Sequence, residues 1–334
     1  MQVMRSSLYG AAVVLVLLSP WAMASAADGR RYESIFCFGD SFTDTGNNPA
    51  VFAWYSVVDP VTRPPYGSSF FGHPTGRNCD GRLIVDFIAE GLGLPYVPPY
   101  LGPPFGSPPA AAAAQGFRQG ASLAVGAATA IDVGFFHERG LVPAPSKFPL
   151  NTSLTVQLQW FDSLLKPTLC GTTQECADLF GRSLFFVGEL GVNDYLFSIG
   201  KMAAGDIISS IVPSVIGSIR QAIEWLIEEH GAKSLVVPGV IPLGCSPPVI
   251  DMFADPDPAG YDSKTGCMLK NNEIAQRHNT LLQQSLQEIR GNHPGGLERT
   301  FLRQPSASIF WDGVHFTEAA NRYIASSWMS SIVD

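Results

Sequence analysis

Short, nearly continuous apolar runs constrain this sequence more than any other feature. Residues 35–38, 182–188 and 234–238 are such runs, and each is followed within a few residues by glycine and small polar residues. A continuous apolar run of this length is typical of a strand buried on both faces, as in a parallel sheet covered by helices. A similar run at 120–130 predicts a further strand.

Between these runs, apolar residues recur at the spacing of an α-helix. Residues 83–92, 207–229, 271–290 and 317–332 all show this pattern, with apolar side chains three or four positions apart. Strands that alternate with helices predict an α/β sandwich of three layers, a parallel sheet with helices on both faces. No linker or internal repeat interrupts the pattern, which favours one domain.

A serine directly after the first run is the first candidate for chemistry. Gly39-Asp40-Ser41 follows residues 35–38, and open α/β sheets place such residues in a crevice at the carboxyl ends of the strands. Serine becomes a nucleophile only beside a base. Asp312 and His315 are three positions apart, so the aspartate can orient one imidazole nitrogen while the other accepts the serine proton. We predict Ser41, Asp312 and His315 as a catalytic triad.

Three short segments, in this order, carry a resemblance to a known family. They are Gly39-Asp40-Ser41-Phe42, Gly191-Val192-Asn193-Asp194 and Asp312-Gly313-Val314-His315. Together they resemble the plant GDSL esterase/lipase family of SGNH hydrolases, from about Ile35 onward. The resemblance implies a flavodoxin-like sandwich and a serine esterase that works without a cofactor. No Gly-x-Ser-x-Gly occurs, so the chain is not an α/β-hydrolase of the lipase type.

The resemblance also implies three donors for an oxyanion: the backbone N–H groups of Ser41 and of residue 127, and the side chain of Asn193. Asn193 comes shortly after the run 182–188, where an amide can point at developing charge. Position 127 is glycine in the family and alanine here. The extra methyl of Ala127 narrows the site, and a negative φ is the condition under which its N–H keeps the role.

The chain departs from the family between about Gly296 and Ser308. Similar family members have several dozen more residues there, including a fifth strand. We therefore expect the sheet to lack its last strand, with Asp312 and His315 held by a short tether. Two functions fit this expectation: an esterase that acts through an acyl-enzyme, or a non-catalytic binding or structural relative on the same fold.

The first residues read as a targeting segment. A basic start, a short apolar core and an Ala-x-Ala site predict a secretory signal peptide over residues 1–27, followed by one domain over residues 28–334. The alternative is an uncleaved signal anchor. With the signal removed, no stretch spans a membrane. The predicted location is the secretory pathway, either extracellular, in the cell wall or in the Golgi lumen.

Six cysteines in a secreted chain can form disulfides. Cys170 with Cys176, and Cys245 with Cys267, bracket loops, and the family resemblance implies both pairings. Cys37 falls in the first strand and reads as a buried thiol. The spacings match no zinc pattern and the histidines are scattered, so we predict no metal.

Asn151-Thr152-Ser153 is an acceptor sequence for N-glycosylation in a secreted protein, either occupied or unoccupied.

The formal net charge is −8 and the basic residues do not cluster, which argues against a nucleic-acid partner. The predicted partner is a small-molecule or polysaccharide ester. Trp54, Tyr55, Tyr96 and Tyr100 are equally suited to stacking on sugars and to lining an acyl pocket. The O-acetyl groups of a cell-wall polysaccharide such as xylan are the favoured substrate, with acyl lipids as the other class that the family implies.

Overall fold

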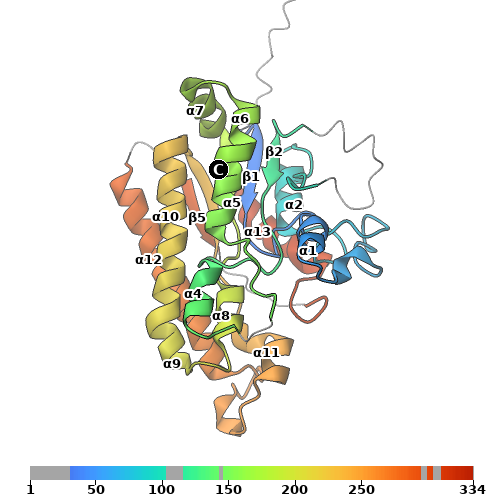
Figure 1. The fold of residues 1–334 in the computed structure, drawn as a ribbon, viewed down its shortest axis with the longest axis vertical. Helices are drawn as coiled ribbons and strands as arrows, with labels where there is room; N and C mark the ends of the chain where they lie inside the picture. Colours follow the sequence, from blue (N-terminus) through green and yellow to red (C-terminus); the bar gives the residue numbers. More distant parts are fainter. Residues whose placement is uncertain (1–30, 103–115, 143–145, 295–298, 304–309, 334) are drawn as a thin grey trace, which may run out of the picture. The chain divides into compact units, whose positions relative to one another are not determined.

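The computed structural model describes residues 31–102, 116–142, 146–294, 299–303 and 310–333 (Figure 1). Five parallel strands form one sheet, in the order β2-β1-β3-β4-β5. Their bounds are β1 (Ser34–Phe38), β2 (Gly120–Ser122), β3 (Ser183–Val187), β4 (Ser234–Pro238) and β5 (Arg299–Arg303). This is the flavodoxin-like strand order, so the predicted fold class is confirmed.

The expectation that the sheet lacks its last strand is wrong. Strand β5 pairs with β4 along its whole length, from Arg299 opposite Ser234 to Arg303 opposite Pro238. The segment Arg-Thr-Phe-Leu-Arg has only three residues typical of strands, yet five residues are a normal strand length. The segment after α12 therefore completes the sheet, and β4 has a hydrogen-bonded neighbour on both sides.

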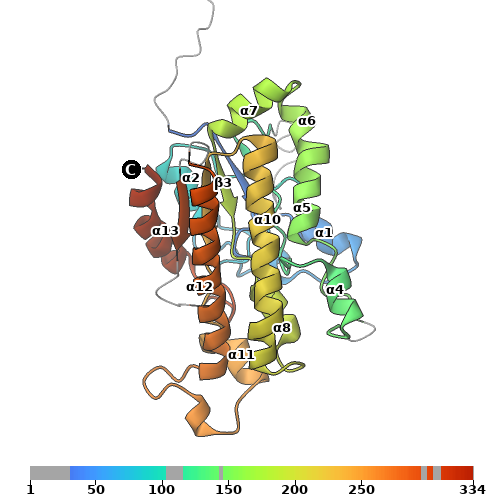
Figure 2. The same cartoon turned by 90° about the vertical axis from the view of Figure 1, so that its left-hand side faces the viewer.

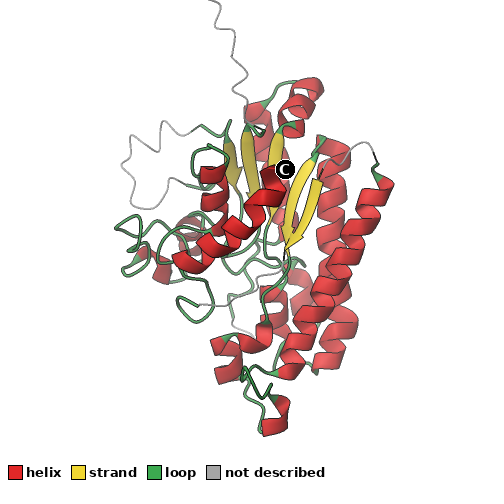
Figure 3. Cartoon of the chain, turned by 180° about the vertical axis from the view of Figure 1, so that it is seen from behind, coloured by secondary structure: helices red, strands yellow, loops and turns green. Residues whose placement is uncertain are grey.

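Helices cover both faces of the sheet. On one face α5 (Leu154–Trp160), α10 (Val212–His230) and α12 (Leu269–Asn292) lie side by side (Figure 2). On the other face α13 (Glu318–Val333) packs with α2 (Ile84–Gly91) and crosses the strands (Figure 3). The shorter helices are α1 (Asn48–Trp54), α4 (Val133–Glu138), α6 (Lys166–Leu169), α7 (Thr173–Gly181), α8 (Val192–Ser198), α9 (Ala204–Asp206) and α11 (Pro247–Met252).

Strands β1, β3 and β4 are apolar after their first serine because both of their faces are buried. All residues of β1, β3 and β4 are buried. Phe36 of β1 lies edge-on to Phe161 and Phe180, with ring centroids 5.6 and 5.5 Å apart. Edge-to-face contacts of this kind add to the stability gained from burial. They also fix α5 and the turn after it against the sheet.

Both predicted disulfides, Cys170–Cys176 and Cys245–Cys267, are formed in the structure. The second joins the loop after β4 to the segment that leads into α12. Cys37 and Cys79 are free and buried. A disulfide stabilises mainly by restricting the unfolded chain, so the longer of these two loops is the more strongly stabilised.

The predicted signal peptide, residues 1–27, lies outside the described residues. Within the part of the chain that the structure describes, no helix combines the length and the apolar character needed to cross a bilayer.

Candidate active site

The loop after β1 places Ser41 at the carboxyl edge of the sheet, beside the end of β3. Gly39 has φ +150°, and a Cβ there would lie only 3.2 Å from the Cα of Gly188. The side chain of Gln157 holds this glycine from the α5 side, since its Oε1 accepts from the Gly39 N–H and its Nε2 donates to the Gly39 carbonyl, each at 2.8 Å. The backbone before the serine is therefore fixed on two sides.

Ser41, His315 and Asp312 lie in one hydrogen-bonded chain. His315 Nε2 is 2.7 Å from Ser41 Oγ, and His315 Nδ1 is 2.8 Å from Asp312 Oδ2. The backbone N–H of His315 also donates to Asp312 Oδ1 at 2.9 Å. Phe42 packs against the imidazole, with ring centroids 5.3 Å apart. The segment between α12 and α13 thus brings His315 to Ser41.

The carboxylate of Asp312 is held in its charged form. Partial burial alone would raise the pKa of Asp312, but hydrogen bonds and charge attraction from His315, together with a hydrogen bond from Tyr66, hold it well below its usual range. A carboxylate that stays charged can fix the tautomer and orientation of the imidazole.

Tyr66 is a site residue that the sequence did not reveal. Its hydroxyl donates to Asp312 Oδ2 at 2.8 Å, and its ring lies edge-on to Trp311, with centroids 6.0 Å apart. Burial raises the pKa of Tyr66, and Asp312 raises it further, so the phenol remains a donor. The two prolines before Tyr66 predict a rigid turn, but no sequence signal links that turn to residue 312.

Asn193 lies in the first turn of α8, just after β3. Its Nδ2 is 2.9 Å from the carbonyl of Ala128 and 3.2 Å from Asp40 Oδ2. The adjacent Asp194 is buried and accepts hydrogen bonds from the backbone N–H groups of Ala130 and Ile131, at 2.9 and 3.0 Å. Strand β3 and the loop after β2 are thereby joined next to Ser41.

Ala127 has a positive φ of 63°, not the negative φ that was the condition for its role. The left-handed region favours glycine, the residue that the family resemblance implies at this position. Adopting it with a Cβ costs roughly 1–2 kcal/mol. Within the described part of the chain, the N–H groups of Ser41 and Ala127 donate to no acceptor.

The remaining predicted aromatic residues do not gather at the triad. The ring of Tyr96 packs against Phe70, and the ring of Tyr100 packs against Phe117. Trp54 is 60% exposed on α1. The described residues contain no group of three or more His, Cys, Asp or Glu side chains that could hold a metal ion.

Comparison with known proteins adds to this geometry. The chain matches the GDSL-like lipase/acylhydrolase family over residues 35–328. The GDSL esterase/lipase At5g45910 of Arabidopsis thaliana is 38% identical, across 90% of this chain and 91% of that protein. GDSL esterase/lipase At1g31550 of the same plant is 35% identical, across 91% and 85%. A sinapine esterase of Brassica napus is 36% identical, across 89% and 85%.

The fold is the α/β fold of the SGNH hydrolases. The chain belongs to the plant GDSL esterase/lipase family, a family of ester hydrolases. The alignment with At5g45910 runs over 351 positions, more than the 334 residues of this chain, so this chain lacks residues that the relative has. That the missing residues fall between Gly296 and Ser308 stays a prediction.

Glu189 is buried directly after β3, with one oxygen unpaired. Its Oε2 accepts from Thr43 Oγ1 at 2.9 Å, while its Oε1 has no partner among the described residues. Burial raises the pKa of Glu189 to about 7. At pH values between the ordinary carboxyl pKa and about 7, the native state therefore keeps a proton on Glu189 that the unfolded chain has released. In that window the free energy of unfolding falls as pH rises.

We expect Glu189→Gln to flatten this dependence, because glutamine mimics the protonated acid and does not titrate. The slope of unfolding free energy against pH should become shallower by up to about 1.4 kcal/mol per pH unit. At pH 8 the Glu189→Gln variant should also be more stable than the parent. Urea unfolding between pH 5 and 8 measures this. Glu229→Gln, at an exposed position on α10, is the control, and equal slopes in all three proteins would contradict the assignment.

Proposed function

We propose that this chain is a serine esterase in which Ser41, His315 and Asp312 carry the reaction. The 2.7 Å contact between Ser41 Oγ and His315 Nε2 is the observation on which the proposal rests. Ser41 Oγ bonds to the ester carbonyl carbon while His315 takes its proton. The carbon–alkoxy bond then breaks, and His315 gives that proton to the departing alcohol. Water, activated in turn by His315, releases the acid and restores Ser41.

The oxyanion of each tetrahedral intermediate is assigned to three donors. The N–H groups of Ser41 and Ala127 are unpaired among the described residues, so they are available without breaking an existing bond. The expected negative φ at Ala127 is wrong, and we keep its N–H as a donor because the alanine adopts the left-handed backbone that a glycine would take and leaves this N–H unpaired. Asn193 Nδ2 supplies the third donor by giving up its contact with Asp40, the longer of its two contacts at 3.2 Å. Donors that are already in place stabilise developing charge without reorganisation.

The non-catalytic alternative loses the observation that prompted it. It depended on a missing fifth strand and on a tether too short for His315. Strand β5 is present, and His315 contacts Ser41. The esterase therefore accounts for more of the structure than a binding or structural protein on the same fold.

A short acyl group is the substrate class that the site favours. The methyl of Ala127 stands beside a proposed oxyanion donor, where the glycine that the family resemblance implies would have only a hydrogen. This supports O-acetyl groups of a cell-wall polysaccharide such as xylan over an acyl lipid. The predicted signal peptide, and so delivery to the cell wall, the extracellular space or the Golgi lumen, agrees with such a substrate. The sinapine esterase among the relatives makes a sinapine ester the competing choice.

The first test is hydrolysis of p-nitrophenyl acetate by the parent and by Ser41→Ala. Loss of the nucleophile should lower kcat by about a thousandfold or more, as removal of a triad serine does in other hydrolases. Ser330→Ala, at an exposed position on α13, should retain full activity. A folded Ser41→Ala protein that is as active as the parent would sink the assignment.

Tyr66→Phe tests the hydroxyl that supports Asp312. It removes a hydrogen bond to a charged group, so kcat should fall roughly tenfold with little change in KM. With one donor fewer, Asp312 attracts the imidazolium more strongly, and the acidic limb of the kcat/KM profile should move to higher pH.

Tyr323→Phe, exposed on α13, is the matched control for Tyr66→Phe. A purely structural role for Tyr66 predicts lower thermal stability with an unchanged pH profile, and that result would count against a positioning role.

Ala127→Gly should relieve backbone strain and widen the site together. The free energy of unfolding should rise by about 1 kcal/mol, because glycine accepts a positive φ. The ratio of p-nitrophenyl butyrate to acetate hydrolysis should also rise. Ala53→Gly in helix α1 should instead destabilise by about 1 kcal/mol. If the butyrate-to-acetate ratio stays the same, the methyl does not set acyl length.

A further inference from the structure

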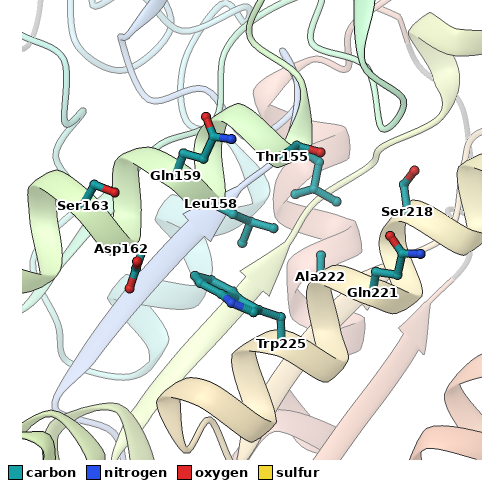
Figure 4. A pocket seen from close by; sticks show the side chains of 10 residues that line it. Thr155, Leu158, Gln159, Asp162, Ser163, Ser218, Gln221, Ala222 and Trp225 are labelled. Atoms are coloured by element: carbon teal, nitrogen blue, oxygen red, sulfur yellow. The ribbon is translucent and has the colours of Figure 1, made fainter. Parts of the chain in front are cut away.

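A groove that contains no triad residue lies between α5 and α10, on the outer side of the helical layer. Its cavity has a volume of about 350 Å³. The side chains that matter most here are Thr155, Leu158 and Gln159 from α5, with Gln221, Ala222 and Trp225 from α10 (Figure 4). This volume is within the range of small-molecule sites.

The lining of this α5–α10 groove combines an aromatic surface with neutral polar groups. Trp225, Leu158 and Ala222 supply apolar surface, and the Trp225 ring is held by the edge of His230, with centroids 4.2 Å apart. The amides of Gln159 and Gln221 make no hydrogen bond within the described part of the chain.

The one carboxylate of the groove, Asp162, is paired with Lys166 of the following turn. The groove thus offers no unpaired charge to a ligand. Its chemistry suits a neutral molecule that has one apolar face and a rim of hydroxyl and amide groups. An N-acetylated sugar ring has this character, since its C–H face packs on an aromatic ring while its edge accepts and donates hydrogen bonds.

The sequence provides an acceptor for such a sugar just before α5, the helix that forms one wall of the groove. Asn151-Thr152-Ser153 is the sole Asn-x-Ser/Thr sequence in the 334 residues, and the Asn151 side chain is exposed. Ser153 is the N-cap of α5 and accepts from the Val156 N–H. Asn151 therefore precedes the helix that forms one wall, four residues before Thr155. From Thr155 to Asp162 the helical wall extends for about 10 Å, comparable to a disaccharide.

We propose that Asn151 carries an N-linked glycan whose N-acetylglucosamine core lies in the α5–α10 groove. The inference depends on the proposed passage through the secretory pathway but not on the hydrolytic role of Ser41. The bond from Asn151 Nδ2 to C1 of the sugar forms at the expense of a lipid-linked oligosaccharide diphosphate. The lipid diphosphate is the leaving group, and the amide proton is released.

The test uses the full chain secreted from a eukaryotic host that makes high-mannose glycans. Mass spectrometry of the peptide that contains Asn151 shows whether the glycan is present. Endoglycosidase H, which cuts between the two core sugars, is then applied to native and to denatured protein. Release of the glycan from the native parent should be at least about tenfold slower than from the denatured parent, because a docked core is inaccessible to the enzyme for most of the time.

Trp225→Ala should bring the native release rate close to that of the denatured protein. Gln221→Ala, which removes an exposed amide at the rim, should also accelerate release. Leu164→Ala is the matched control, because Leu164 is 51% exposed in the turn after α5 and outside the groove, and it should release at the parental rate.

Three results would overturn the proposal. The first is a secreted chain without a glycan on Asn151. The second is a native parent cleaved as fast as Trp225→Ala. The third is an unglycosylated Asn151→Gln chain whose tryptophan fluorescence responds to added N,N′-diacetylchitobiose while the parent carries no glycan, which would assign the groove to a separate saccharide. Esterase activity measured on the same samples reports on Ser41 independently of all three.

Discussion

The buried carboxylate of Asp44 is the interaction on which the arrangement of the site depends. It accepts hydrogen bonds from four backbone N–H groups, those of Gly46, Asn47, Asn48 and Gly126. The first three belong to its own loop after β1, and the fourth belongs to the loop after β2. One side chain thereby ties the loop of Ser41 to the loop of Ala127. Burial raises the pKa of Asp44 to about 7, and these hydrogen bonds limit that rise.

Asp194 has the same function on the other side of Ser41, where it joins the start of α8 to Ala130 and Ile131. The three proposed oxyanion donors come from two loops and the first turn of α8, and packing alone would hold these three segments in place poorly. Fully buried carboxylates hold these segments instead. They accept hydrogen bonds from backbone N–H groups of two segments at once, and no water is available there to replace those bonds. Burying these carboxylates lowers the stability of the fold, and their hydrogen bonds in turn keep the site rigid.

Local signals explain what the sequence could predict. The strands of the sheet core are continuous apolar runs, and Ser41, Asp312 and His315 stand in short motifs whose chemistry is evident from residue type. Strand β5 was missed because three strand-type residues between two arginines carry little periodicity. Tyr66 and the positive φ of Ala127 were missed because they depend on contacts between distant loops. A hydrogen bond from residue 66 to residue 312 exists only once the sheet has brought both loops to its edge.

Helix α5 connects the two sites of this molecule because its opposite faces have different partners. Gln157 points inward and makes both hydrogen bonds that hold Gly39, two residues before Ser41. Thr155, Leu158 and Gln159 line the groove on the outward side. A sugar packed against that outer face would restrict the motion of the helix, and the backbone of Gly39 would share the restriction. A glycan docked as proposed would therefore contact the same short helix that holds the backbone before Ser41.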